Sequence, residues 1–335
     1  MISPWVQFII CAGIIVLSGS KLTRSAAAIA KNTGIGTAWA GALMLPLATS
    51  LPELVTTLRA VSINAPDLAL GNILGSCLFN LALLAVIDLL EGRSALTARL
   101  NQSHIITASL SIITICLAAI AILGDNLLSI GWVGGETLLI ALVYIFGSRL
   151  LFRFERNKLP RPDAGEILSD DAINKSVSTP RALLQFLIAA GFIVIAGIFL
   201  TDATDSIADI TGLGHTFIGS IFLAISTSLP ETVTTITAVR LGYLDMAVAN
   251  VFGANFMNLF ILFWADLFYI PAPLLYAVSE NHLLSALMVV FISTVVILGL
   301  TYRSERKIGR IGYDTLLVLA GYLIAVLLLL KTGGN

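Results

Sequence analysis

The segment PLATSLPELVTT at 46–57 returns with few changes as AISTSLPETVTT at 224–235. Its two glutamates, Glu53 and Glu231, are 178 residues apart (231 minus 53). The same offset aligns further pairs without a gap: Asn80 with Asn258, Glu136 with Asp314, and AGIIVLSG at 12–19 with AGFIVIAG at 190–197. The chain is therefore one unit written twice.

The composition places this repeated unit in a membrane. The 335 residues are 57% hydrophobic and 12% charged, and the mean hydropathy is +0.96. A water-soluble domain of this length does not need so much apolar side chain, so we expect a polytopic membrane protein. The apolar stretches predict ten spans, near 4–20, 37–62, 67–90, 103–123, 127–149, 182–200, 216–240, 244–269, 282–301 and 312–330. The first stretch lacks a preceding basic residue and a small-x-small cleavage site, so we interpret it as a retained helix.

Five spans in each copy predict an inverted arrangement. Residues 1–150 form the first five-helix repeat, 182–335 form the second, and 151–181 form a cytoplasmic linker. Because five is odd, the second copy enters the membrane from the opposite side. Threading ten spans from an outside N-terminus puts all 19 Lys and Arg except Arg59 and Lys331 on one side, which the positive-inside rule makes the cytoplasm. We therefore predict an all-α polytopic protein of the plasma (inner) membrane, with ten transmembrane helices in two inverted five-helix repeats and both termini extracytoplasmic.

Each copy places a proline and a glutamate in the middle of its second span. Pro52 and Pro230 have no N–H to donate, so they free backbone carbonyls inside the membrane. A lone charge at that depth costs at least about 2.5–3.5 kcal/mol on insertion scales. We expect Glu53 and Glu231 to converge near the pseudo-twofold axis, where a divalent cation balances their charge. The oxygen ligands available suit Ca2+ or Na+ and disfavour Zn2+ or Cu+.

Other polar residues in these spans have a simpler interpretation. Ser, Thr and Asn often only join neighbouring membrane helices, and we assign that role to Thr56, Thr57, Thr234 and Thr235. For Asn72 and Asn250 the same role stands beside a second one, support of the ion ligands from behind. The three cysteines have no metal-ligand spacing and are expected to pack as small apolar groups.

The motifs resemble those of the cation/Ca2+ exchanger superfamily, whose two alpha-repeats carry T-S-x-P-E followed by G-N-x-x-G-S-N-x-x-N/D. Here TSLPE at 49–53 precedes GNILGSCLFN at 71–80, and TSLPE at 227–231 precedes ANVFGANFMN at 249–258. The resemblance covers nearly the whole chain and is nearest to the prokaryotic sodium/calcium exchangers. It implies ten helices, with the first and sixth sliding past the other eight, and no cofactor. The proton-coupled calcium exchangers place their acids in a G-N-x-x-E context, which this sequence lacks.

Carried over position by position, the resemblance implies a layered ion site. The central Ca2+ site comprises Glu53, Glu231 and the backbone oxygens of Thr49 and Thr227, with Asn80 and Asn258 at the middle level. One flanking Na+ site comprises the Ala224 carbonyl, Thr227, Ser228 and Ser76, and its mirror comprises the Pro46 carbonyl, Thr49, Ser50 and residue 254.

Three positions depart from the family pattern. Ala254 stands where the family usually has Ser, so the mirror Na+ site loses a hydroxyl. Cys77 replaces the usual Asn of the first repeat. Asn258 stands where several relatives, including the potassium-dependent branch, have Asp, which argues against K+ co-transport. The family's usual three-Na+ stoichiometry therefore stays open for this chain.

The prediction is a secondary antiporter, not an enzyme, that exchanges Ca2+ for Na+ by alternating access, with inorganic cations and the lipid bilayer as partners. Coupling to H+ and transport of another divalent cation such as Mg2+ or Mn2+ stay open. An intramembrane hydrolase acting on phosphate needs cationic clamps, yet only Arg59 accompanies the TSLPE segments. A passive channel would show flux without countertransport. The basic clusters are expected to set topology, so we predict no nucleic-acid partner and infer no obligate protein partner.

Overall fold

The computed structural model describes residues 3–92, 96–124, 129–157, 178–211, 224–303, 306–309 and 311–332. Eight long helices carry most of this chain: α1 (Pro4–Thr33), α5 (Pro66–Glu91), α7 (Ser103–Leu123), α8 (Gly135–Arg156), α9 (Thr179–Ile210), α12 (Leu244–Phe268), α13 (His282–Tyr302) and α14 (Tyr313–Thr332). Shorter helices lie between them: α2 (Thr37–Trp39), the π-helix η1 (Ala40–Met44), α3 (Leu45–Thr49), α4 (Leu51–Ser62), α6 (Leu96–Arg99), α11 (Leu229–Arg240) and the 3-10 helix η3 (Leu274–Tyr276).

Two very short antiparallel hairpins precede α8 and α14, and the apolar pattern did not predict them. Strand β1 (Ser129–Ile130) pairs with β2 (Val133–Gly134), and β3 (Lys307–Ile308) pairs with β4 (Ile311–Gly312). Gly131 and Gly309, which are 178 positions apart, turn the two hairpins with φ of 67° and 64°. Glycine adopts this left-handed conformation without steric cost.

The helices are long and apolar enough for a membrane protein. Among the described residues eight helices qualify as spans by length and composition, and the bent pair Thr37–Thr49 and Leu51–Ser62, with an angle of 43°, adds a ninth. The seventh predicted span, 216–240, lies partly outside the described residues, and so does most of the predicted linker. The count of ten and the inverted arrangement therefore stay predictions.

Helix α1 is longer than the apolar stretch predicted. It continues past residue 20 to Thr33 and ends at Gly34, whose φ of 71° gives a left-handed cap. The extension carries charged residues, but alanines of high helix propensity and the buried Leu22 hold it against the bundle. Hydropathy alone stops at the first charge, whereas the helix does not.

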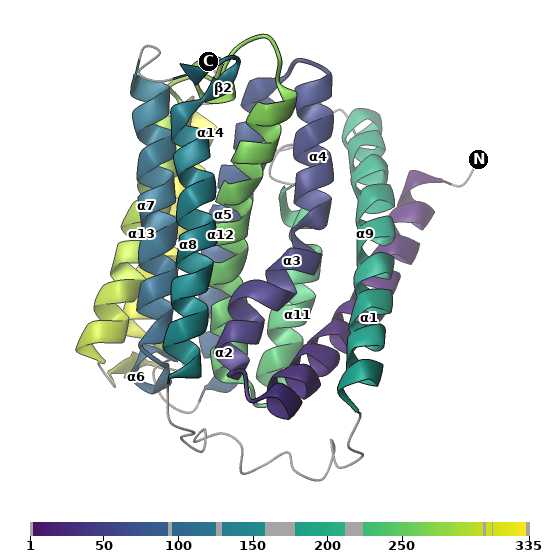
Figure 1. The fold of residues 1–335 in the computed structure, drawn as a ribbon, viewed down its shortest axis with the longest axis vertical. Coiled ribbons are helices and arrows are strands. Elements are labelled where there is room, and N and C mark those ends of the chain that lie inside the picture. Colours follow the sequence, from purple (N-terminus) through teal and green to yellow (C-terminus); the bar gives the residue numbers. More distant parts are fainter. Residues whose placement is uncertain are drawn as a thin grey trace.

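Helices α1 and α9 pack against each other along one side of the molecule (Figure 1). They contact the remaining helices mainly through α3, α4 and α11. Helices α5 and α12 pack against each other and are the most deeply buried spans, with 67% and 89% of their apolar windows inside the molecule. The residues that carry the polar motifs therefore lie at the centre, next to the short helices of the TSLPE segments.

Two buried aspartates make hydrogen bonds at the C-terminal ends of α5 and α12. Asp88 and Asp266, again 178 positions apart, each accept hydrogen bonds from a backbone N–H just beyond their own helix and from a hairpin in the other copy. The contacts are Asp88 Oδ1 with Leu96 N (3.0 Å), Asp88 Oδ2 with Gly312 N (2.7 Å), Asp266 Oδ1 with Leu274 N (2.6 Å) and Asp266 Oδ2 with Gly134 N (2.8 Å). Each carboxylate thus ties a central helix to the hairpin that leads into α14 or α8.

Candidate ion-binding site

Both TSLPE segments interrupt a helix at their serine. Ser50 (φ −88°, ψ 8°) separates α3 from α4, and Ser228 (φ −84°, ψ 11°) precedes α11 in the same conformation. The proline two residues later lies in the first turn of the new helix, where a missing N–H is tolerated. Each break therefore starts a new helix in the interior and places its glutamate in the first turn, at the positive end of the helix dipole.

Glu53 and Glu231 are 0% and 1% exposed, and each is hydrogen-bonded to the serine of the other copy. Ser228 Oγ donates to Glu53 Oε1 (3.2 Å), and Ser50 Oγ donates to Glu231 Oε1 (3.0 Å). Each carboxylate thus lies against the TSLPE segment of the other copy. These contacts bring the two predicted central ligands together.

One oxygen of each glutamate is left over. Glu53 Oε2 and Glu231 Oε2 are buried and have no hydrogen-bond partner. Burying a charged oxygen without a partner is costly, and two neighbouring carboxylates add mutual repulsion. A cation, or a proton, relieves both costs.

The threonines beside the glutamates follow the same crosswise pattern, whereas the nearby carbonyls are bonded within their own copy. Thr227 lies against Glu53, and Thr49 lies against Glu231. Their hydroxyl groups donate to backbone oxygens one turn back, Thr227 to Ala224 (3.1 Å) and Thr49 to Leu45 (3.1 Å). The carbonyl of Pro46 accepts Ser50 N–H (3.0 Å), and that of Ala224 accepts Ser228 N–H (3.1 Å). The two carbonyls predicted to flank the site thus already have protein donors.

The central helices bring further unpartnered oxygens. Ser76, Asn80 and Asn258 are all fully buried. Ser76 Oγ, Asn80 Oδ1 and both amide atoms of Asn258 have no hydrogen-bond partner. Helix α5 packs against α4 and α11, and so does α12, so these groups lie on the helices that border the two glutamates.

Asn72 and Asn250 bond to threonines and not to the glutamate carboxylates. Asn72 donates to Thr57 Oγ1 (3.2 Å), and Asn250 donates to Thr235 Oγ1 (2.9 Å) and Thr234 Oγ1 (3.0 Å). These bonds join helices, as predicted for the threonines. Asn250 also approaches the backbone oxygen of Glu231 (3.4 Å).

One residue with a contact to the predicted site was missed. Asn255 on α12 accepts a hydrogen bond from Asn80 Nδ2 (3.1 Å) and is fully buried. The signal was present in the sequence, because Asn255 is the counterpart of Cys77 under the 178-residue offset. Sequence reasoning noted only the departure from the family pattern at Cys77 and not its counterpart Asn255.

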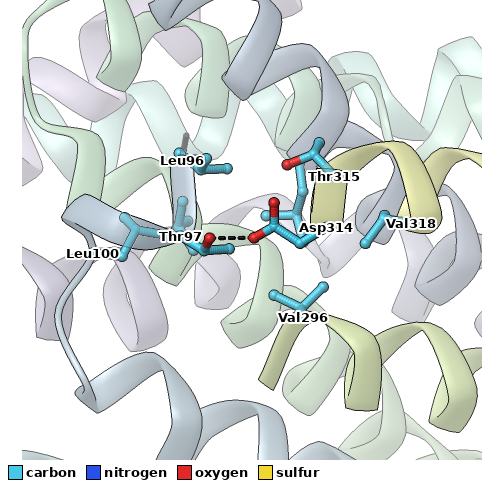
Figure 2. Close-up of a pocket in the computed structure, with 9 residues that line it drawn as sticks. Leu96, Thr97, Leu100, Val296, Asp314, Thr315 and Val318 are labelled. Atoms are coloured by element: carbon cyan, nitrogen blue, oxygen red, sulfur yellow. Dashed lines mark hydrogen bonds between the residues drawn. The ribbon is translucent and has the colours of Figure 1, made fainter. Parts of the chain in front are cut away.

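A separate small pocket is lined by residues of α5, α6, α12, α13 and α14 (Figure 2). Asp314 accepts a hydrogen bond from Thr97 there, and the remaining wall is mainly aliphatic, with Leu96, Leu100, Val296 and Val318 labelled in the view.

In the part of the chain that the structure describes, no three or more His, Cys, Asp or Glu residues gather to bind a metal. The candidate site is therefore a pair of carboxylates surrounded by neutral oxygens.

Comparison with known proteins identifies the family. A family model described as "Sodium/calcium exchanger protein" matches residues 3–150 and 181–331. The chain belongs to the sodium/calcium exchanger family. The exchanger is 29% identical over 255 residues, 74% of each chain, to inner membrane protein YrbG of Escherichia coli (strain K12). It is 32% identical over 117 residues, 33% of each chain, to sodium/calcium exchanger MaX1 of Methanosarcina acetivorans.

The fold of the exchanger is also that of a solved structure. The sodium-calcium exchanger NCX_Mj, soaked with Na+ and Sr2+, superposes with a TM-score of 0.73 over 98% of both chains at 19% identity. The family model confirms the family membership that the motifs predicted. The exchanger is a multi-pass membrane protein and a cation/Ca2+ antiporter, which makes it a secondary transporter and rules out the intramembrane hydrolase.

Proposed function

We propose that the exchanger moves Ca2+ in exchange for Na+, by alternating access, through a site centred on Glu53 and Glu231. The observation that carries this proposal is the reciprocal pair of serine–glutamate bonds, which leaves one buried oxygen of each glutamate without a partner. Two carboxylates carry a charge that one Ca2+ or two Na+ balance. An empty charged pair is unfavourable in the interior, so only the loaded site passes between the two states.

The ligands of the central Ca2+ are the two glutamates and the backbone oxygens of Thr49 and Thr227. Ca2+ takes about six to eight oxygens, and two bidentate carboxylates with two carbonyls supply six. Asn80 and Asn258 lie at the middle level. The flanking Na+ ligands are those that the family resemblance implies: Pro46, Ser50, Ser76, Ala224 and Ser228.

Helices α1 and α9 are the moving part in this proposal. They pair with each other and meet the remaining helices mainly at the short helices beside the glutamates. Gly197 of α9 lies directly on Pro52, because a Cβ placed there would be 2.4 Å from Pro52 Cγ. Motion of α9 thus changes how far Glu53 is covered.

The uneven distribution of Lys and Arg supports an inner-membrane location with both termini outside the cytoplasm.

Coupling to H+ is the second candidate. The unpartnered oxygen of each glutamate, which favours cation binding, is also a place where a proton can bind. A proton on each carboxyl would neutralise the pair as a Ca2+ does. The G-N-x-x-G context of the first motif and the A-N-x-x-G context of the second, which both lack the acid of G-N-x-x-E, favour Na+.

Ca2+ uptake into proteoliposomes distinguishes these functions. The purified protein is reconstituted with Na+ inside, diluted into choline medium, and supplied with radioactive Ca2+. Uptake is expected to follow the Na+ gradient and to stop when K+ or choline replaces internal Na+. Uptake without Na+ that follows an imposed pH gradient would establish H+ coupling instead. Flux with no counter-ion on the other side would establish a channel. Unlabelled Mg2+ and Mn2+ as competitors test the choice of divalent cation.

A further inference from the structure

The hydrogen bonds between α5 and α12 differ between the two copies of the repeat. Asn80 Nδ2 donates to Asn255 Oδ1 (3.1 Å), and Asn255 Nδ2 donates to the Cys77 carbonyl (3.2 Å). The 178-residue offset exchanges Asn80 with Asn258 and Asn255 with Cys77. The counterpart of the first bond would need an amide oxygen at position 77. A thiol does not supply one, because sulfur is only a weak acceptor.

The consequence falls on Asn258. Among the described residues its amide has only the Cys77 thiol, a weak acceptor, within reach, and neither buried amide atom makes a hydrogen bond of normal geometry. Asn80 differs, because its NH2 group is held by Asn255 and only its Oδ1 is free. The Asn80 oxygen is therefore fixed in place, whereas the Asn258 amide can turn either its oxygen or its NH2 group towards an ion.

A second difference points the same way. Ser76 contributes a fully buried hydroxyl without a partner on α5, and its counterpart on α12 is Ala254. Helix α5 thus offers a free hydroxyl and a fixed amide oxygen. Helix α12 offers one amide with no fixed orientation.

We propose that Cys77 determines cation selectivity by leaving Asn258 unheld, so that the α12 half of the site binds Na+ more weakly than the α5 half. This inference rests on the function proposed above for Glu53 and Glu231. Na+ needs several correctly oriented oxygens and is repelled by an N–H, so an unheld amide must first be ordered before it binds. Ca2+ binding depends mainly on the two carboxylates, so the orientation of the Asn258 amide affects it less.

The variant Cys77→Asn tests the inference by supplying the missing amide. Position 255 shows that an asparagine fits at this crossing when it is fully buried. The added hydrogen bond is expected to lower the Na+ concentration for half-maximal exchange about two- to tenfold. The half-maximal Ca2+ concentration should change less than about twofold, since the carboxylates are untouched.

Two controls separate orientation from packing. Cys77→Val fills a similar volume without an amide and must not lower the half-maximal Na+ concentration. Cys116→Val, at an exposed cysteine of the membrane helix α7, should behave as wild type. Asn255→Cys removes the bond that holds Asn80, so it should raise the half-maximal Na+ concentration and provides a test if Cys77→Asn does not fold.

The outcomes separate this inference from the proposed function. If the wild-type protein shows no Na+-driven Ca2+ uptake, the proposed function fails, and binding of radioactive Na+ to purified protein still compares the variants. If the wild type exchanges Na+ for Ca2+ but Cys77→Asn keeps its Na+ dependence, the inference is overturned. An equal gain in Cys77→Val would overturn it as well, because the effect would then come from packing.

Discussion

Ser50 Oγ donates a hydrogen bond to Oε1 of Glu231, a residue 181 positions away in the other copy of the repeat. Its counterpart, Ser228 with Glu53, has nearly the same length, 3.2 Å against 3.0 Å. Each copy thus orients the acid of the other. Displacing one TSLPE segment relative to the other must therefore disturb both carboxylates together.

The serines are the first test of this geometry. Ser50→Ala and Ser228→Ala each remove a hydrogen bond to a charged group, which is worth about 1.5–3 kcal/mol. We expect the half-maximal Ca2+ concentration for uptake to rise about tenfold or more, to a similar extent in both variants. Ser62→Ala removes only an exposed bond to the Arg59 carbonyl and serves as the control. A wild-type Ca2+ dependence in either site variant would contradict the crosswise arrangement.

The contact between α9 and the proline of α4 is a second test. Gly197→Ala places a methyl group 2.4 Å from Pro52 Cγ, so one of the two helices must move. Overpacking of this kind costs about 1–3 kcal/mol, and we expect the exchange rate to fall about tenfold. Gly191→Ala on the same helix meets nothing within 4 Å and should exchange normally. Equal rates in the two variants would show that this contact does not matter for transport.

The aspartates at the ends of α5 and α12 are expected to affect stability. Asp88→Asn turns an NH2 group towards one of two backbone N–H groups, Leu96 or Gly312, and leaves that donor unsatisfied at a cost of about 1–3 kcal/mol. Asp266→Asn does the same at its own pair. Both variants should lower the midpoint of thermal unfolding in detergent. Asp202→Asn provides the comparison, because it breaks only the exposed ion pair with Arg59, worth at most about 1 kcal/mol. If Asp202→Asn lowered the unfolding midpoint more than Asp88→Asn and Asp266→Asn do, the stabilising role given to the two buried aspartates would be wrong.

Much of this architecture could be predicted from the sequence because the proline and glutamate of the TSLPE segment appear twice, at a fixed offset. The offset of Glu53 and Glu231 predicted that the two acids meet, and the structure brings them together. The bonds of Asn72 and Asn250 to threonines match the helix-joining role expected from residue type, since a buried amide in a helix bundle needs a hydroxyl or carbonyl partner.

Other features could not be predicted in this way. Hydropathy stopped α1 near residue 20, because a window counts the charges of the extension and not the contacts that bury Leu22. The same offset relates Asp88 to Asp266, but acids near helix ends are common, and only three-dimensional contacts show that they cap the opposite copy. The unheld amide of Asn258 is a relationship between three side chains, which no linear pattern displays.

The central claim is that the transported ion neutralises Glu53 and Glu231 together. The direct measurement is Na+-driven uptake of radioactive Ca2+ by Glu53→Gln and Glu231→Gln in proteoliposomes, beside Glu280→Gln at an exposed position. Glutamine keeps the shape and removes the charge, so we expect both site variants to lose uptake while eluting as folded protein, and the control to retain it. Uptake at wild-type rates in both site variants would contradict the claim.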